Sequence, residues 1–101
     1  MKIVAFVPDL MDRSRFPNAL DVTFVSSLGA LLSTDADIVV ADLARDGALQ
    51  ALMDLDNSSV RKIGFIPHEQ RDVIESATAQ GIEALPRSRF FSQIAQMLEL
   101  S

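Results

Sequence analysis

Short apolar runs alternate along the chain with segments of helical spacing. The runs occupy residues 2–7, 22–25, 37–41, 61–66 and 82–85. They are nearly continuous and rich in β-branched residues, which is typical of strands that helices bury on both faces. The pattern therefore predicts five strands of a parallel sheet.

The first three helices are predicted between these runs. Pro17 interrupts the first segment, because proline removes a backbone donor, so this helix is expected to be short. The second, within residues 26–32, has room for about two turns. In the third, Leu49, Leu52 and Met53 share one face. The polar loop 56–59 is expected to end that helix.

The last two helices carry boundary signals. Pro67 predicts the start of one helix, and Gly81 predicts a left-handed C-cap at its end. Ser88 is expected to cap the final helix. Phe90 and Phe91 begin its apolar stripe, which is typical of core packing, with one ring at the edge of the core.

Strands that alternate with helices require right-handed crossovers, and a small doubly wound sheet commonly takes the order 2-1-3-4-5. The prediction is thus an α/β fold with three layers, α/β/α, and a five-stranded parallel sheet in this flavodoxin-like order. The first and third strands then lie side by side. A crevice opens at their carboxyl ends, where ligands of open α/β sheets bind.

The length of 101 residues fits a single domain spanning 1–101. The absence of cysteine excludes disulfides and thiolate metal sites. A net charge of −5 argues against nucleic-acid binding, which needs clustered basic residues. The apolar start of the chain is interpreted as a buried strand rather than a signal peptide, because Pro8 and Asp9 follow it. No apolar stretch is long enough to span a membrane, so we expect a cytoplasmic protein that binds no membrane.

Two aspartates are the strongest candidate site. Asp9 follows the first predicted strand and Asp42 follows the third, so the topology brings them together at the crevice. The two carboxylates have the chemistry to hold Mg²⁺ together. Alternatively, one of them has the chemistry to attack a phosphoryl group. The alternative stays open that Asp9 caps the first helix and Asp42 caps the turn after its strand.

Other residues on the same rim give weaker signals. His68 and Arg87 follow the fourth and fifth strands, and Arg87 has the charge to pair with an acid or contact a phosphate. The segment 8–11 after the first strand contains no glycine, which disfavours nucleotide binding.

The chain resembles the receiver (CheY-like) domains of bacterial response regulators over nearly its full length. Asp42, within residues 38–43, looks like the phosphoacceptor aspartate of that family, and Asp9 looks like one of its Mg²⁺-binding acids. The resemblance implies that the carbonyl of Ala44 is a further metal ligand and that Arg87 stands near the family's lysine.

The chain also departs from that family's pattern. Pro67 stands where receivers carry a hydroxyl residue, and Arg87 replaces the lysine. The usual aromatic switch residue of the fifth strand is missing near Leu85. The chain therefore resembles an atypical receiver, or pseudo-receiver.

Three functions follow as expectations. The first is a signalling or protein-interaction module without the usual phosphorylation switch, which contacts a protein partner or forms a homodimer through residues 69–100. An exposed apolar patch that includes Phe90 or Phe91 would mark its binding face. The second is a Mg²⁺-dependent phosphoacceptor, a single-domain response regulator, whose only catalysis is the phosphorylation and dephosphorylation of Asp42. The third is a small-molecule binder at the crevice.

Overall fold

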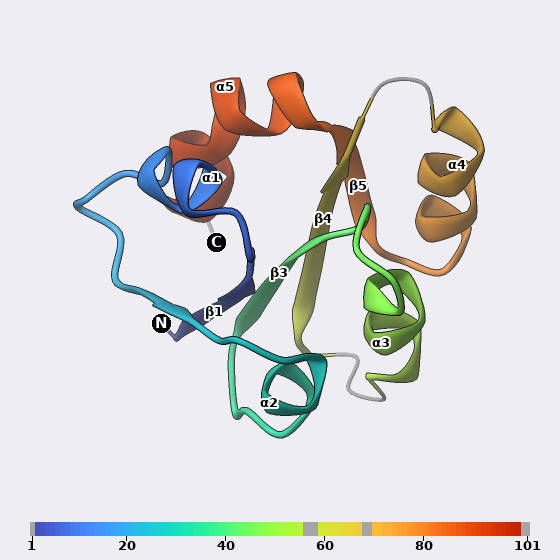
Figure 1. The fold of residues 1–101 in the computed structure, drawn as a ribbon, viewed down its shortest axis with the longest axis horizontal. Helices are drawn as coiled ribbons and strands as arrows, with labels where there is room; N and C mark the ends of the chain where they lie inside the picture. The colour runs from blue at the N-terminus through green and yellow to red at the C-terminus, as the bar shows by residue number, and fades with distance from the viewer. Residues whose placement is uncertain (1, 56–58, 68–69, 100–101) are drawn as a thin grey trace.

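The computed structural model describes residues 2–55, 59–67 and 70–99. Its five strands form one sheet with all neighbours parallel, in the order β2-β1-β3-β4-β5. The fold class and strand order are as predicted from the sequence (Figure 1). The strands are β1 (Ile3–Phe6), β2 (Val22–Phe24), β3 (Ile38–Asp42), β4 (Arg61–Ile66) and β5 (Glu83–Pro86).

Five helices cover the two faces of the sheet, which gives three layers (Figure 1). Residues around α1 and along α5 pack on one face, whereas α2, α3 and α4 pack on the other. None of the helices in the described ranges has the length and hydropathy that a membrane span requires. The helices are α1 (Leu10–Ser14), α2 (Leu28–Leu32), α3 (Ala48–Asp54), α4 (Arg71–Ala79) and α5 (Arg87–Glu99).

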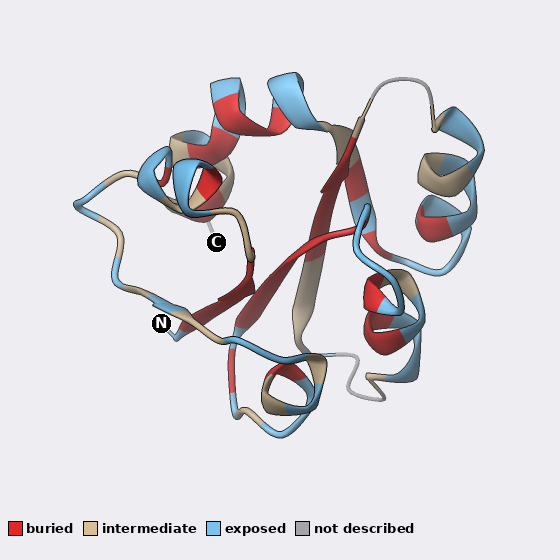
Figure 2. Ribbon diagram, viewed as in Figure 1, coloured by how far each residue is buried: buried red, intermediate tan, exposed pale blue. Residues whose placement is uncertain are grey.

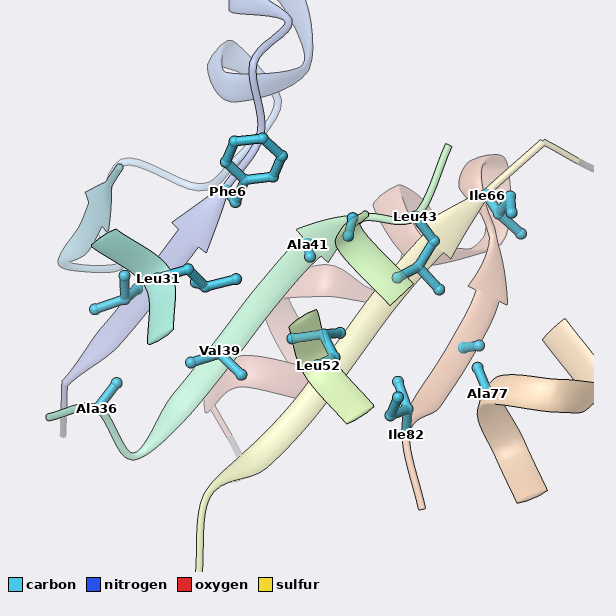
Figure 3. Packing of buried hydrophobic residues seen from close by; sticks show 13 residues of the cluster. Phe6, Leu31, Ala36, Val39, Ala41, Leu43, Leu52, Ile66, Ala77 and Ile82 are labelled. Atoms are coloured by element: carbon cyan, nitrogen blue, oxygen red, sulfur yellow. The ribbon is translucent and has the colours of Figure 1, made fainter. Parts of the chain in front are cut away.

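The two cores follow from the alternation of side chains along each strand. In β1, Ile3 and Ala5 face the α1 and α5 layer, and Val4 and Phe6 face the layer of α2, α3 and α4. Every residue of β1 and β3 is buried, as Figure 2 shows for the middle of the sheet. The core between the sheet and the second layer is drawn in Figure 3. Burial on both faces explains why the strands are continuous apolar runs.

Phenylalanine rings dominate the core beneath α1 and α5. Phe90 stacks on Phe65 with ring centroids 5.0 Å apart, and Phe16 meets Phe90 and Phe91 edge to face. Phe90 is fully buried and Phe91 is 9% exposed, with the guanidinium of Arg15 above its ring. The prediction of core packing is confirmed. The two rings consequently do not form the exposed patch expected to mark a binding face.

The short helices and the glycine cap agree with the sequence prediction. α1 ends at Ser14, before Pro17, and α2 is a five-residue helix capped by Ser27. Gly81, the second residue after the end of α4, has a φ of 80°, and its N–H donates to the carbonyl of Thr78. A left-handed glycine ends this helix because a side chain would strain that backbone conformation.

Two predicted helix starts are wrong. α4 begins at Arg71 rather than at Pro67, and the carbonyl of Pro67 accepts the N–H of Gln70 ahead of the helix. α5 begins at Arg87, directly after Pro86, so Ser88 lies inside the first turn and not at the cap. Pro67 follows the last residue of β4 and Pro86 is the last residue of β5, so both prolines lie at the end of a strand.

One predicted core residue is also placed differently. The buried face of α3 consists of Ala48, Ala51 and Leu52, while Met53 is 38% exposed. Ala48, Ala51 and Leu52 stand at positions i, i+3 and i+4 and therefore share one helix face, and Met53 lies about 100° further round the helix, away from the sheet. Of the expected polar loop after α3, residues 56–58 lie outside the described residues.

Gly64 in β4 leaves room for Leu43, which follows β3 and lies over β4 (Figure 3). A Cβ at Gly64 would lie 2.5 Å from Leu43 Cδ1 and 2.6 Å from its Cγ. Leu43 is buried, so its side chain cannot move aside freely. We expect Gly64→Ala to lower the free energy of unfolding by about 1–3 kcal/mol, measured by urea denaturation.

Gly29→Ala is the matched control. Gly29 lies in α2, and the nearest atom to an added Cβ is 4.0 Å away. Alanine favours the helix, so this variant should be as stable as the wild type or more stable by up to about 1 kcal/mol. Equal stability of Gly64→Ala and wild type would contradict the close contact.

Candidate functional site

The predicted crevice belongs at the carboxyl ends of β1 and β3, which are neighbours in the sheet. Their register pairs Ile3 with Ile38 and Phe6 with Ala41. Asp9 follows β1 after two residues, and Asp42 is the last residue of β3. The two predicted acids are therefore carried to the same edge of the sheet by adjacent strands.

Asp9 caps the first helix. Its backbone is extended at φ −74° and ψ 120°, as at a typical N-cap. Its Oδ1 accepts the N–H of Met11 at 2.8 Å and that of Asp12 at 3.3 Å. This carboxylate satisfies two backbone donors that α1 would otherwise leave unpaired.

Asp42 stabilises the turn that follows β3. It is only 7% exposed, and its Oδ1 accepts the N–H of Ala44 at 3.0 Å. Its Oδ2 lies 3.4 Å from Nε of Arg45. The carboxylate thus bonds to the backbone two residues on, as aspartate does in an Asx turn. Ala44 contributes its N–H to this arrangement.

An ion pair between Asp12 and Arg87 completes the crevice, and the sequence analysis missed its acid. Asp12 is 2% exposed, and its Oδ1 accepts a hydrogen bond from Nη2 of Arg87. The pair joins residues 75 positions apart, one in α1 and one at the start of α5. The sequence could have indicated that Asp12 is buried, because it stands four residues before Phe16. With helical spacing, residues four positions apart face the same side, and both are buried here.

Asp12 is the main partner of Arg87. The hydrogen bond that Arg87 donates to Asp12 raises the pKa of Arg87, burial partly opposes this effect, and the charges of Asp12, Asp9 and Asp42 raise the pKa further. A raised pKa adds stability that is lost only when the pH rises through that pKa, far into the alkaline range. The positive charge in the crevice is therefore permanent under ordinary conditions.

The three carboxylates are engaged with protein groups. Asp9 and Asp42 each accept a backbone N–H through Oδ1, and Arg87 donates to Asp12, so a Mg²⁺ ion would compete with these bonds for the carboxylates. Within the described ranges, no group of three or more His, Cys, Asp or Glu side chains is arranged to hold a metal ion. His68 lies outside the described residues.

A groove runs along the outer edge of the sheet beside β5. We call it the β5 groove; its volume is about 580 Å³. At one end Arg61 binds Glu83 through two hydrogen bonds of 2.5 and 2.7 Å, and its Nη1 donates to the carbonyl of Met97. The hydrogen bond with Glu83 raises the pKa of Arg61. The lining comprises Arg61, Thr78, residues 81–85, Gln93 and Met97.

Removing the charge of Asp12 should destabilise the protein. Asp12→Asn keeps the size of the side chain but leaves Arg87 without its buried counter-ion. We expect a loss of about 1–2 kcal/mol in the free energy of unfolding at pH 7, measured by urea denaturation. This is less than for a fully buried pair, because the side chain of Arg87 is 45% exposed.

Asp21→Asn, at an exposed aspartate before β2, controls for the change in net charge. It should alter stability by less than about 0.5 kcal/mol. Equal effects of the two substitutions would show that the pair with Arg87 contributes nothing specific.

In comparisons with known proteins, no family model, no curated protein and no solved structure matches the chain. Inference about the function of this chain therefore rests on its fold and on the geometry of the crevice.

Proposed function

We propose that this chain is a receiver-like interaction module of the cytoplasm that acts through contact with a protein partner or a second copy, without phosphorylation at Asp42. The proposal rests on one observation, namely that the acids of the crevice are already bonded to other groups of the protein. These acids are engaged as a helix cap, a turn cap and the partner of a partly exposed arginine.

The environment of Asp42 argues against a phosphoacceptor role. A nucleophilic carboxylate needs a free oxygen and a path for the phosphoryl group. Asp42 is nearly buried, one oxygen accepts the N–H of Ala44, and the other lies near Arg45. Phosphorylation would have to break this turn, and among the described residues no group of three or more His, Cys, Asp or Glu side chains is arranged to hold a metal ion that would offset the added charge.

The proposed contact surface is the region 69–100, centred on the β5 groove. Phe90 and Phe91 do not contribute to it, because both are buried. The groove instead offers partly exposed apolar side chains, Leu85 and Met97, beside the exposed Thr78 and Gln93. β5 is a short edge strand that ends in Pro86, which disfavours the addition of a partner strand. We therefore propose contact through side chains seated in the groove.

A titration with beryllofluoride and Mg²⁺ tests the function. Beryllofluoride mimics a phosphoryl group on an aspartate, and amide shifts of isotope-labelled protein report whether it binds. We expect the amides of Asp9, Asp42 and Ala44 to show no saturable shift, because the carboxylate of Asp42 is already bonded.

Asp42→Asn is the control for that titration, and Mg²⁺ alone corrects for salt. Saturable shifts in the wild type that vanish in Asp42→Asn would overturn the proposal. They would establish the alternative, a Mg²⁺-dependent phosphoacceptor that uses Asp42.

Sedimentation velocity tests whether the partner is a second copy. If the β5 groove forms a homodimer, the sedimentation coefficient should rise with concentration, and Thr78→Arg should abolish the rise because its side chain fills the groove. Thr23→Arg is the matched control, since Thr23 is exposed on β2 at the opposite edge of the sheet. Dimerisation that survives Thr78→Arg would exclude the groove as the dimer interface.

A further inference from the structure

Two large apolar side chains project into solvent at the start of α1. Leu10 is 74% exposed and Met11 is 78% exposed, more than any other large apolar residue in the described ranges. Single exposed apolar residues are ordinary on a protein surface, but an adjacent pair rimmed by charged groups is the pattern of an interaction site.

Two arginines flank this pair on the surface of α1. Arg13 stands three residues after Leu10 and Arg15 four residues after Met11, and these spacings make side chains neighbours on a helix. Arg13 donates to a backbone carbonyl and Arg15 lies over an aromatic ring, which holds both guanidinium groups in place. Neither arginine forms a salt bridge with a carboxylate of the described residues. We call Leu10, Met11, Arg13 and Arg15 the α1 knob.

A pocket lies at the opposite end of the sheet, where β3 and β4 begin. The last residues of α2 and α3 line it, and its volume is about 330 Å³; we call it the α2–α3 pocket. Asp35 and Asp54 add negative charge to it, and neither forms a salt bridge with a described cation. The apolar part of the lining comprises Leu32, Ala36, Val39, Leu55 and Val60.

The α1 knob and the α2–α3 pocket complement each other. The knob presents apolar side chains beside positive charge, and the pocket presents an apolar lining beside negative charge. The pocket has the volume of roughly ten water molecules at about 30 Å³ each, so an apolar side chain has room to enter it. With a net charge of −5, two copies repel each other on average, and contact is favoured where a positive surface meets a negative one.

We propose that the α1 knob of one copy enters the α2–α3 pocket of a second copy. α1 lies on one face of the sheet and α2 and α3 on the other, at opposite ends of the strands (Figure 1). Each copy therefore offers its knob to one neighbour and its pocket to another, which gives a head-to-tail chain of copies. Both surfaces lie outside the β5 groove, so the inference goes beyond the function proposed for that groove.

Sedimentation velocity of the wild type at increasing concentration is the first test. The sedimentation coefficient should rise past the value of a dimer, because a dimer still carries a free knob at one end and a free pocket at the other. A coefficient that stays constant, or that levels off at a dimer, would overturn the inference.

Two double variants each remove one of the surfaces. Leu10→Gln with Met11→Gln removes the apolar pair, keeps the net charge and suits a helix. Asp35→Arg with Asp54→Arg reverses the charge of the pocket. All four positions are exposed, so both variants should fold, as far-UV circular dichroism checks. Each variant alone should sediment as a monomer at concentrations where the wild type associates, and association of either variant with itself would contradict the inference.

An equal mixture of the two double variants tests the pairing itself. The first variant keeps an intact pocket and the second keeps an intact knob, so the mixture should form dimers of one copy of each. These dimers have no further intact surface, and the sedimentation coefficient should stop rising at the value of a dimer. A mixture that sediments as monomers would rule out contact between knob and pocket.

Thr78→Arg separates this inference from the function proposed for the β5 groove, because Thr78 lines that groove. The substitution should leave head-to-tail association unchanged. If Thr78→Arg abolishes association and the two glutamines in α1 do not, the inference fails, while the β5 groove remains as the contact surface between copies.

Discussion

The burial of the parallel sheet on both faces is the constraint on which the rest of the structure depends. With all of β1 and β3 buried, side chains along these strands must be apolar on both sides, and polar groups are restricted to the strand ends. Asp42 marks that limit, because it is both the last residue of β3 and the first polar one. The position of the crevice is thus a consequence of packing, and its chemistry depends on which residues occupy the strand ends and the adjoining helix starts.

Local pairing then determines what those residues can do. A carboxylate that caps a helix or a turn accepts hydrogen bonds from backbone N–H groups. An external ligand must replace these hydrogen bonds, so each of them lowers the free energy gained when the ligand binds. Asp9 and Asp42 both make bonds of this kind within three residues of themselves. The third acid, Asp12, is held by Arg87 over a long range, which also ties α1 to the start of α5. The crevice therefore contributes to stability, and its geometry favours a structural role for the acids.

How far the sequence predicts this molecule depends on the range of the interactions. The strands follow from the apolar runs, which are local signals in the sequence. Their order, and with it the position of Asp9 and Asp42, follows from the topology that alternating strands and helices generally adopt. The partner of Asp12 could not be predicted, because nothing local links it to a residue 75 positions away. The predicted starts of α4 and α5 were wrong for a related reason. Proline and serine favour helix starts locally, but α4 begins four residues after Pro67, and α5 follows β5 directly and so includes Ser88 in its first turn.

A permanent, covalently tethered cation has a functional consequence that differs from that of a bound ion. A site that gains and loses Mg²⁺ and a phosphoryl group alternates between two charge states, and such a difference is what biases a switching element. In this crevice the charge of Arg87 is fixed by a raised pKa and by its bond to Asp12. In the interaction module proposed above, a fixed charge gives the crevice no second state with which to bias the surface beside β5 and α5, so regulation would lie in the amount or the availability of its partner.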